Sequence, residues 1–262
     1  MKKVLAIINF LVVIALIIWN FIAGSEGLNG NTIASLSRKY DNLFTPAGYA
    51  FSIWGLIYTG LLANGLYQLK TVFTFGKEDE FVSKSGPWLI LANLANAAWL
   101  WAWLTENTGL SVIFILINMA SLIIVTLKLN MEQWDAPIPL IVFVWWPISL
   151  YGGWIAVATI ANLAAYLSKI GWVQIFNEVT WTVLMIILAT LINLLMVFLR
   201  NMREFAAVGV WALMAISVRH SNQISLIQWT AISCAVILSA VIFFHGLRNW
   251  KTNPFRNLLK KS

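Results

Sequence analysis

Residues 138–167 read IPLIVFVWWPISLYGGWIAVATIANLAAYL and contain no Lys, Arg, Asp or Glu. An apolar helix of about 20 residues, rising 1.5 Å per residue, crosses a hydrocarbon core of about 30 Å. The stretch is uniformly apolar, whereas a strand of a membrane barrel alternates apolar and polar residues. It therefore predicts a membrane-spanning helix. Pro147 removes one backbone donor and predicts a bend in the first half of this helix.

The composition of the whole chain agrees with this stretch. Of its 262 residues, 60% are hydrophobic and 10% are charged, and the mean hydropathy is +0.81. Soluble domains carry about 25% charged residues, so this chain has too little charge to cover a surface in water. The net charge of +7 does not indicate nucleic acid, because the basic residues lie between apolar runs and at the C-terminus, facing anionic lipid. We therefore expect an integral membrane protein with lipid as its surroundings.

Eight apolar runs predict an all-α membrane protein with about eight transmembrane helices. The seventh run is short, and each of the others is long enough to cross the membrane. The first run follows Met1-Lys2-Lys3 but is longer than the apolar part of a signal peptide and lacks a good cleavage site, so we expect a retained helix. The runs cover approximately residues 4–23, 45–69, 86–104, 110–129, 138–167, 178–199, 205–219 and 227–246.

The distribution of basic residues predicts the orientation. With the N-terminus inside, most of the 17 Lys and Arg residues lie in inner segments, as the positive-inside rule requires of an even number of spans. Both termini are then cytoplasmic, and we expect a bacterial cytoplasmic membrane. The outer residues are Arg38, Lys39, Lys169 and Arg219. The inner residues are Lys2, Lys3, Lys70, Lys77, Lys84, Lys128, Arg200, Arg203, Arg248, Lys251, Arg256, Lys260 and Lys261.

No acidic residue, Lys or Arg lies deep within any run. Ionisable groups inside the membrane mark proton relays and ion sites, and they supply general acids and bases. Their absence argues against a proton-coupled transporter, a pump and a rhodopsin, and it removes the usual general acid–base machinery from the membrane interior. We interpret His220 and His245, near the ends of their runs, as interfacial polar residues rather than axial haem ligands. Cys234 is the single cysteine, which excludes a disulfide within one chain.

The apolar runs contain tryptophan and asparagine instead. Many of the 15 Trp residues lie near run ends, as in an aromatic belt, but Trp54, Trp145, Trp146 and Trp154 lie well inside their runs. An indole at this depth needs a hydrogen-bond partner or lines a cavity. We favour a pocket for a flat hydrophobic ligand, with helix packing as the alternative. Helical spacing predicts three sets of residues that each share one face of a helix. They are Trp54 with Tyr58, Asn93 and Asn96 with Trp99 and Trp103, and Trp154 with Ala158 and Asn162.

Three motifs resemble the tryptophan-rich sensory protein (translocator protein) family. They are FTPAGYAFSIWGLIY at residues 44–58, Asn96-Ala-Ala-Trp99, and Trp154-Ile-Ala-Val-Ala158-Thr159-Ile-Ala-Asn162. In the first motif, Ala47 replaces a second proline of the family, Tyr49 replaces a tryptophan, and one residue is missing before Trp54. The resemblance covers residues 1–167.

The resemblance implies a five-helix bundle over residues 1–167, and residues 168–262 then form a three-helix C-terminal extension with a basic cytoplasmic tail. It also implies a membrane sensor that binds a planar hydrophobic ligand, such as a porphyrin or haem, beneath the first outer loop. No cofactor is required, and a homodimer is a further expectation. The expected ligand site comprises Pro46, Tyr49, Trp54, Tyr58, Asn93, Asn96, Trp99, Trp103, Trp146, Trp154, Ala158 and Asn162.

Other functions stay open. A sterol is a less favoured ligand, although Leu163, Tyr166 and Lys169 fit a loose cholesterol-contact pattern. A transporter or permease component for a neutral hydrophobic solute is the first alternative, but the chain shows no clear inverted repeat and no coupling residue. A light-dependent porphyrin-degrading enzyme is the second, although no acid, base or metal constellation is present. The extra helices could pack on the bundle, replace a dimer interface or shield the pocket.

Overall fold

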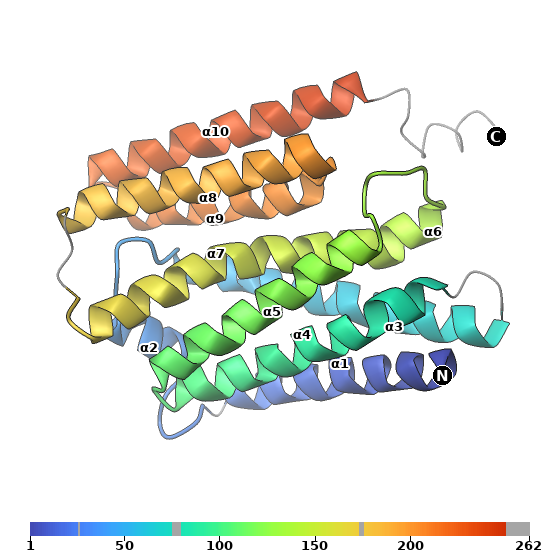
Figure 1. Cartoon of the computed structure of the whole chain (residues 1–262). Coiled ribbons are helices and arrows are strands. Elements are labelled where there is room, and N and C mark those ends of the chain that lie inside the picture. Colours follow the sequence, from blue (N-terminus) through green and yellow to red (C-terminus); the bar gives the residue numbers. More distant parts are fainter. Residues whose placement is uncertain (26, 75–79, 173–175, 250–262) are drawn as a thin grey trace.

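The computed structural model describes residues 1–25, 27–74, 80–172 and 176–249, and these residues form an array of helices with their long axes roughly aligned (Figure 1). Each predicted apolar run contains a helix. The first part of the chain forms α1 (Lys2–Ser25), α2 (Ile33–Lys39), the 3-10 turn η1 (Gly48–Ser52), α3 (Ile53–Thr74), α4 (Glu80–Leu104) and α5 (Thr108–Lys128). The second part forms α6 (Ile138–Leu140), the π-helical turn η2 (Ile141–Trp145), α7 (Trp146–Lys169), α8 (Glu178–Arg200), α9 (Arg203–Arg219) and α10 (Ser225–Arg248).

Among the described residues, five helical segments are long and apolar enough to cross a membrane. They are α1, α5, residues 138–169, α8 and α10. The other long helices are shorter or more polar: α9 has 17 residues, α3 buries Asn64 and Gln68, and α4 buries Asn93 and Asn96. The helical fold is therefore confirmed, whereas the count of eight spans stays a prediction.

The irregular turn within residues 138–169 has a chemical cause. Pro147 has no N–H to donate to the carbonyl of Phe143, and the π-helical turn Ile141–Trp145 lies directly before it. The Phe143 carbonyl accepts a hydrogen bond from Asn64 Nδ2 of α3 at 2.9 Å instead. A buried amide of α3 thus satisfies the backbone group at the place where the sequence predicted a bend.

The helices form two groups. Helices α1, α3, α4, α5 and α7 pack together as one bundle, and α8, α9 and α10 form a second group beside it (Figure 1). The second group contacts the bundle mainly through α9, which packs along α7. The backbones approach closely at Gly153, where an added Cβ would lie 2.7 Å from the Phe205 carbonyl oxygen. A glycine is therefore needed at this position of the seam.

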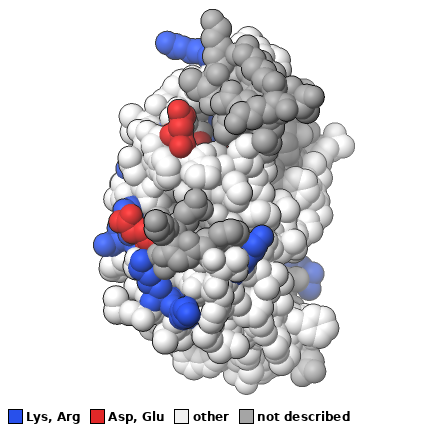
Figure 2. Space-filling model, turned by 90° about the vertical axis from the view of Figure 1, so that its right-hand side faces the viewer, with Lys and Arg blue, Asp and Glu red and all other residues white. Residues whose placement is uncertain are grey.

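The basic residues lie at the two ends of the helices. The start of α1 and the end of α10 are at the same end of the molecule (Figure 1), and that end displays Lys and Arg side chains (Figure 2). Arg38, Lys39, Lys169 and Arg219 belong to the ends of α2, α7 and α9 at the opposite end. Five of the basic residues assigned to the inner side lie outside the described residues, namely Lys77, Lys251, Arg256, Lys260 and Lys261.

Candidate functional site

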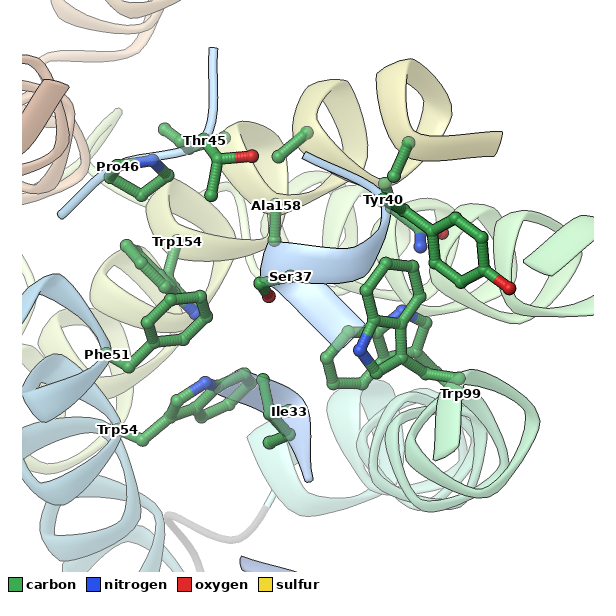
Figure 3. A pocket seen from close by; sticks show the side chains of 15 residues that line it. Ile33, Ser37, Tyr40, Thr45, Pro46, Phe51, Trp54, Trp99, Trp154 and Ala158 are labelled. Carbon is green, nitrogen blue, oxygen red and sulfur yellow. The ribbon is translucent and has the colours of Figure 1, made fainter. Parts of the chain in front are cut away.

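Four tryptophans line a small cavity beneath α2. Figure 3 shows Trp54 of α3, Trp99 of α4 and Trp154 of α7 around a common space, with Ser37 of α2 and Ala158 of α7 also facing it. The cavity has a volume of about 60 Å³. Its lining residues are Ile33, Ser37, Tyr40, Thr45, Pro46, Phe51, Trp54, Trp99, Trp103, Trp154, Val157, Ala158, Ala161, Asn162 and Ala165.

Aromatic contacts fix one side of the cavity. The ring of Trp54 stacks on Tyr58, with centroids 5.2 Å apart, and meets the edge of Trp154 at 6.4 Å. Phe51 meets Trp154 edge-on at 5.8 Å. Offset-stacked and edge-to-face pairs are the favoured geometries of aromatic rings. The segment Phe44–Tyr58 is thereby joined to α7, which brings together two of the three motifs found in the sequence.

The opposite side of the cavity carries unpaired donors. Trp99 and Trp103 are 8% and 5% exposed, and their indole Nε1 atoms are buried without a hydrogen-bond partner among the described residues. Trp101, between them in sequence, is 43% exposed and lies on another face of α4. A buried donor without a partner costs about 1–3 kcal/mol. A ligand with acceptor atoms in the cavity would recover this energy.

The structure brings seven of the twelve predicted residues to the cavity wall: Pro46, Trp54, Trp99, Trp103, Trp154, Ala158 and Asn162. Tyr58 lines an adjoining groove. Four residues lie elsewhere. Asn93 and Asn96 are buried but absent from the cavity wall, Trp146 packs partly buried against the core, and Tyr49 is half exposed with its ring edge-on to Trp211 of α9.

The predicted amide of Asn162 and a second amide, Asn118, make contacts between helices. Asn162 Nδ2 donates to Ser111 Oγ of α5 at 3.0 Å, so this residue both lines the cavity and joins α5 to α7. Asn118 Nδ2 of α5 donates to the Tyr151 hydroxyl of α7 at 2.9 Å. The packing interpretation of asparagine therefore applies to Asn162 together with the pocket interpretation.

A larger groove adjoins the cavity. It has a volume of about 880 Å³ and lies between the end of α1, α2 and the segment from Asp41 to Tyr58. Six residues line both spaces and form the wall between them: Ile33, Ser37, Thr45, Pro46, Phe51 and Trp54. Sequence reasoning missed α2 because residues 24–44 contain turn formers and only a short apolar stretch. The available signal was Thr32-x-x-Ser35, which forms a capping box at the start of α2.

Glu106, in the turn between α4 and α5, holds α2 over the cavity. Its carboxylate accepts hydrogen bonds from Lys39 Nζ at 2.6 Å, from Asn31 Nδ2 at 3.3 Å and from the Tyr40 hydroxyl. The hydrogen bonds from Lys39 and Tyr40 lower the pKa of this carboxyl to about 2. The carboxylate is therefore ionised, and the attachment of α2 intact, at neutral pH.

The end of α9 holds the segment that forms the cavity wall. The Arg219 guanidinium donates to the carbonyls of Asn42 and Thr45 at 2.8 and 2.7 Å and forms an ion pair with Asp41. His220 Nε2 lies 2.8 Å from the Leu43 carbonyl oxygen. Arg219 is the last residue of α9 and His220 follows it, so the residues before Pro46 are docked on the C-terminal helices.

Two further contacts continue this docking beyond Pro46. The backbone N–H of Ala47 donates to the Ala215 carbonyl at 3.1 Å, and Trp211 Nε1 donates to the Ala50 carbonyl at 3.0 Å. Arg219 also lines the groove. No pattern in the sequence indicated these contacts, because they join residues that are more than 150 positions apart.

The described residues form a helical fold with segments long and apolar enough to cross a membrane and an aromatic cavity near one end, which defines the class of this protein as a helical membrane protein. The chain belongs to the TSPO-like protein family, which matches residues 6–244. The family predicted from the three motifs is thus confirmed, and the match extends beyond residue 167 through α8, α9 and most of α10. No curated protein and no solved structure matches the chain.

Proposed function

We propose that the protein is a binding or sensory protein of the tryptophan-rich sensory type that takes a planar hydrophobic ligand, such as a porphyrin, at the tryptophan cavity. The observation that carries the proposal is the pair of buried, unpartnered indole N–H groups of Trp99 and Trp103 at an aromatic cavity. A flat aromatic ligand with nitrogen or oxygen acceptors would stack on the rings and accept from these donors. We propose binding rather than catalysis.

The volumes indicate how such a ligand would enter. A water molecule takes about 30 Å³ of liquid volume, so the cavity of about 60 Å³ is far smaller than a ligand site of about 300–1,000 Å³. The adjoining groove of about 880 Å³ is large enough. Ile33 and Ser37 of α2 lie in the wall between the two spaces. We propose that α2 shifts on binding and joins them into one site.

The C-terminal helices belong to this site in our proposal. The wall of the cavity between Asp41 and Ala50 is held by Arg219, His220, Trp211 and Ala215. The rigid placement of Pro46, Phe51 and Trp54 depends on this docking. The ligand affinity should therefore depend on α9, although α9 supplies only Arg219 to the lining of the groove.

The orientation is part of the proposal. Eight crossings with both termini in the cytoplasm agree with the placement of the start of α1 and the end of α10 at one basic end of the molecule (Figures 1 and 2). The cavity and α2 then lie at the outer side of the membrane. Reaction of single introduced cysteines with an impermeant thiol reagent tests this orientation, with Ser37→Cys accessible from outside.

A fluorescence titration with protoporphyrin in detergent tests the binding function. The wild-type protein should show saturable quenching of tryptophan fluorescence, weakened by Trp154→Ala. Trp99→Phe keeps a ring but removes one N–H donor, and should weaken binding about tenfold, which corresponds to about 1.4 kcal/mol. Trp101→Phe is the matched control on the same helix, because Trp101 faces away from the cavity. Unsaturable quenching, or equal effects of Trp99→Phe and Trp101→Phe, would overturn the proposal.

A further inference from the structure

A second hollow lies on the seam between the bundle and the C-terminal helices. It is an apolar groove of about 200 Å³ between α5 on one side and α8 on the other, with α7 and the start of α9 beneath it. Met119, Ile123 and Leu127 of α5 face Met196 and Arg200 of α8 across it, and Phe205 of α9 contributes to its floor. None of its residues lines the tryptophan cavity.

Packing along the seam explains why this groove exists. The second group of helices reaches the bundle mainly through α9 on α7, so α5 and α8 stand on either side of that contact. The floor position Gly152 carries no side chain, and an added Cβ there would lie 3.5 Å from the Phe205 ring. The groove is thus built from side chains of four helices but is not filled by any of them.

The groove opens towards lipid. Ile123 and Leu127 are 50% and 54% exposed on α5, and both α5 and α8 are long and apolar enough to cross a membrane. The exposed sides of such helices contact hydrocarbon chains rather than water. Thioether side chains adapt to irregular and flexible neighbours, and three of the lining residues are Met119, Met196 and Met202. An acyl chain is the molecule that matches these surroundings.

One end of the groove is positively charged. Arg200 is the last residue of α8, at the end of the molecule that carries the start of α1 and the end of α10. It lies 3.4 Å from Asn130 Oδ1, and within the described part of the chain it forms no ion pair. A guanidinium binds phosphate oxygens through two parallel hydrogen bonds. The charge at this end therefore selects an anionic headgroup.

We propose that the groove binds an anionic phospholipid, with one acyl chain between α5 and α8 and the phosphate at Arg200. Basic pockets between membrane helices on the cytoplasmic side bind anionic lipid headgroups in this way. The bound lipid would join α5 to α8, which are otherwise held together through α7 and α9. The proposal depends on the membrane fold and is independent of ligand binding at the tryptophan cavity.

Native mass spectrometry after exchange into a neutral detergent tests the proposal with phosphatidylglycerol and phosphatidylcholine as probes. We expect each chain to retain one phosphatidylglycerol molecule. The preference over phosphatidylcholine should be about tenfold, because one charge-assisted hydrogen bond supplies a difference of that size. Arg200→Gln should reduce the preference to about parity, and Arg200→Lys should keep part of it. Lys128→Gln is the matched control, because Lys128 lies at the same end of the molecule and outside the groove.

Filling the groove gives an independent test. Met196→Trp should abolish lipid retention and the rise in thermal stability that phosphatidylglycerol gives the wild-type protein. Leu195→Trp is its control on the same helix, since Leu195 is exposed outside the groove. Equal retention of the two lipids by the wild-type protein, or no effect of Arg200→Gln, would overturn the proposal. If Met196→Trp does not fold, Arg200→Gln decides the question alone.

Discussion

The C-terminal helices meet the bundle at two polar joints, which differ in how their charges are matched. We call the joint beside the tryptophan cavity the outer joint and the other the inner joint, after the proposed orientation. At the outer joint, Arg219 and His220 contact residues 41–45, and Arg219 has an acidic partner and two carbonyl acceptors. At the inner joint, the loop of residues 129–137 contacts residues 199–204, through Gln133 Nε2 to the Leu199 carbonyl and Asn201 Nδ2 to the Glu132 carbonyl.

The inner joint also contains charges that are poorly matched. Within the described residues, Arg203 Nε and Glu204 Oε2 are buried without hydrogen-bond partners. Burial, and to a smaller extent the nearby Glu204 carboxyl, raises the pKa of Glu132 to about 7. The comparison teaches that the charged groups are paired at the joint beside the tryptophan cavity, although His220 Nδ1 there is buried without a hydrogen-bond partner among the described residues. The outer joint holds the wall of the tryptophan cavity, whereas we expect the stability of the inner joint to depend on pH.

Both joints depend on the apolar seam between them, and breaking that seam should have the largest effect on stability. Gly153→Ala places a Cβ 2.7 Å from the backbone oxygen of Phe205 and 3.0 Å from Val208 Cβ, so α9 must move away from α7. We expect a loss of about 1–3 kcal/mol, measured as a lower midpoint of thermal unfolding in detergent. Gly55→Ala is the control, since nothing lies within 4 Å of the added atom. Equal midpoints for the two variants would contradict this packing.

Glu132→Gln should reveal the poor matching at the inner joint. The folded pKa of about 7 lies above the ordinary value of 4.5, so the folded state binds a proton more tightly than the unfolded state. The contribution of Glu132 to the stability of the wild-type protein is then highest below pH 4.5, and it falls as the pH rises from 4.5 through 7. The amide should remove this fall and raise stability at pH 8 by on the order of 2 kcal/mol. Parallel curves of stability against pH for the two proteins between pH 5 and 8 would contradict the raised pKa of Glu132.

Glu106→Gln should have a smaller effect, confined to the movement of α2. The loss of the carboxylate weakens the bonds from Lys39 and Tyr40, and we expect protoporphyrin to associate about two to three times faster, because exposed ion pairs are weak. The wild-type pKa is lowered to about 2, so the attachment is present above pH 4.5 and is lost as the pH falls through 2. The attachment is therefore equally present at pH 7 and pH 5. Stopped-flow association rates of the wild-type protein should agree at these two pH values. A Glu106→Gln rate equal to the wild-type rate would show that α2 does not limit entry.

Much of the fold follows from the sequence, because apolar runs require helices in lipid and each predicted run contains one. The two faces of α4 were also predictable, because Trp99 and Trp101 are two residues apart and a helix turns by about 200° over that distance. The family was recognisable from three short motifs. These features depend on local spacing, which a single sequence displays directly.

The remaining features depend on contacts between distant segments. Helix α2 has seven residues and is stabilised by Glu106, which is 67 positions away from Lys39. The role of Arg219 was hidden for the same reason, since its partners are about 175 positions away and it resembled an ordinary basic residue at the end of a helix. Tyr49 was expected in the pocket, but the 3-10 turn Gly48–Ser52 brings its ring against Trp211 of α9.

A protoporphyrin titration of Arg219→Ala tests most directly whether the C-terminal helices belong to the ligand site. The substitution removes the Arg219 donor of the Thr45 carbonyl and one of the two donors of the Asn42 carbonyl, which keeps the Thr45 backbone N–H, so the segment that carries Pro46 should loosen. We predict binding weakened about tenfold, with unchanged helix content, and unchanged binding for the control Arg248→Ala at the opposite end of the C-terminal helices. A folded Arg219→Ala protein that binds protoporphyrin as tightly as the wild-type protein would contradict the assignment of α9 to the site.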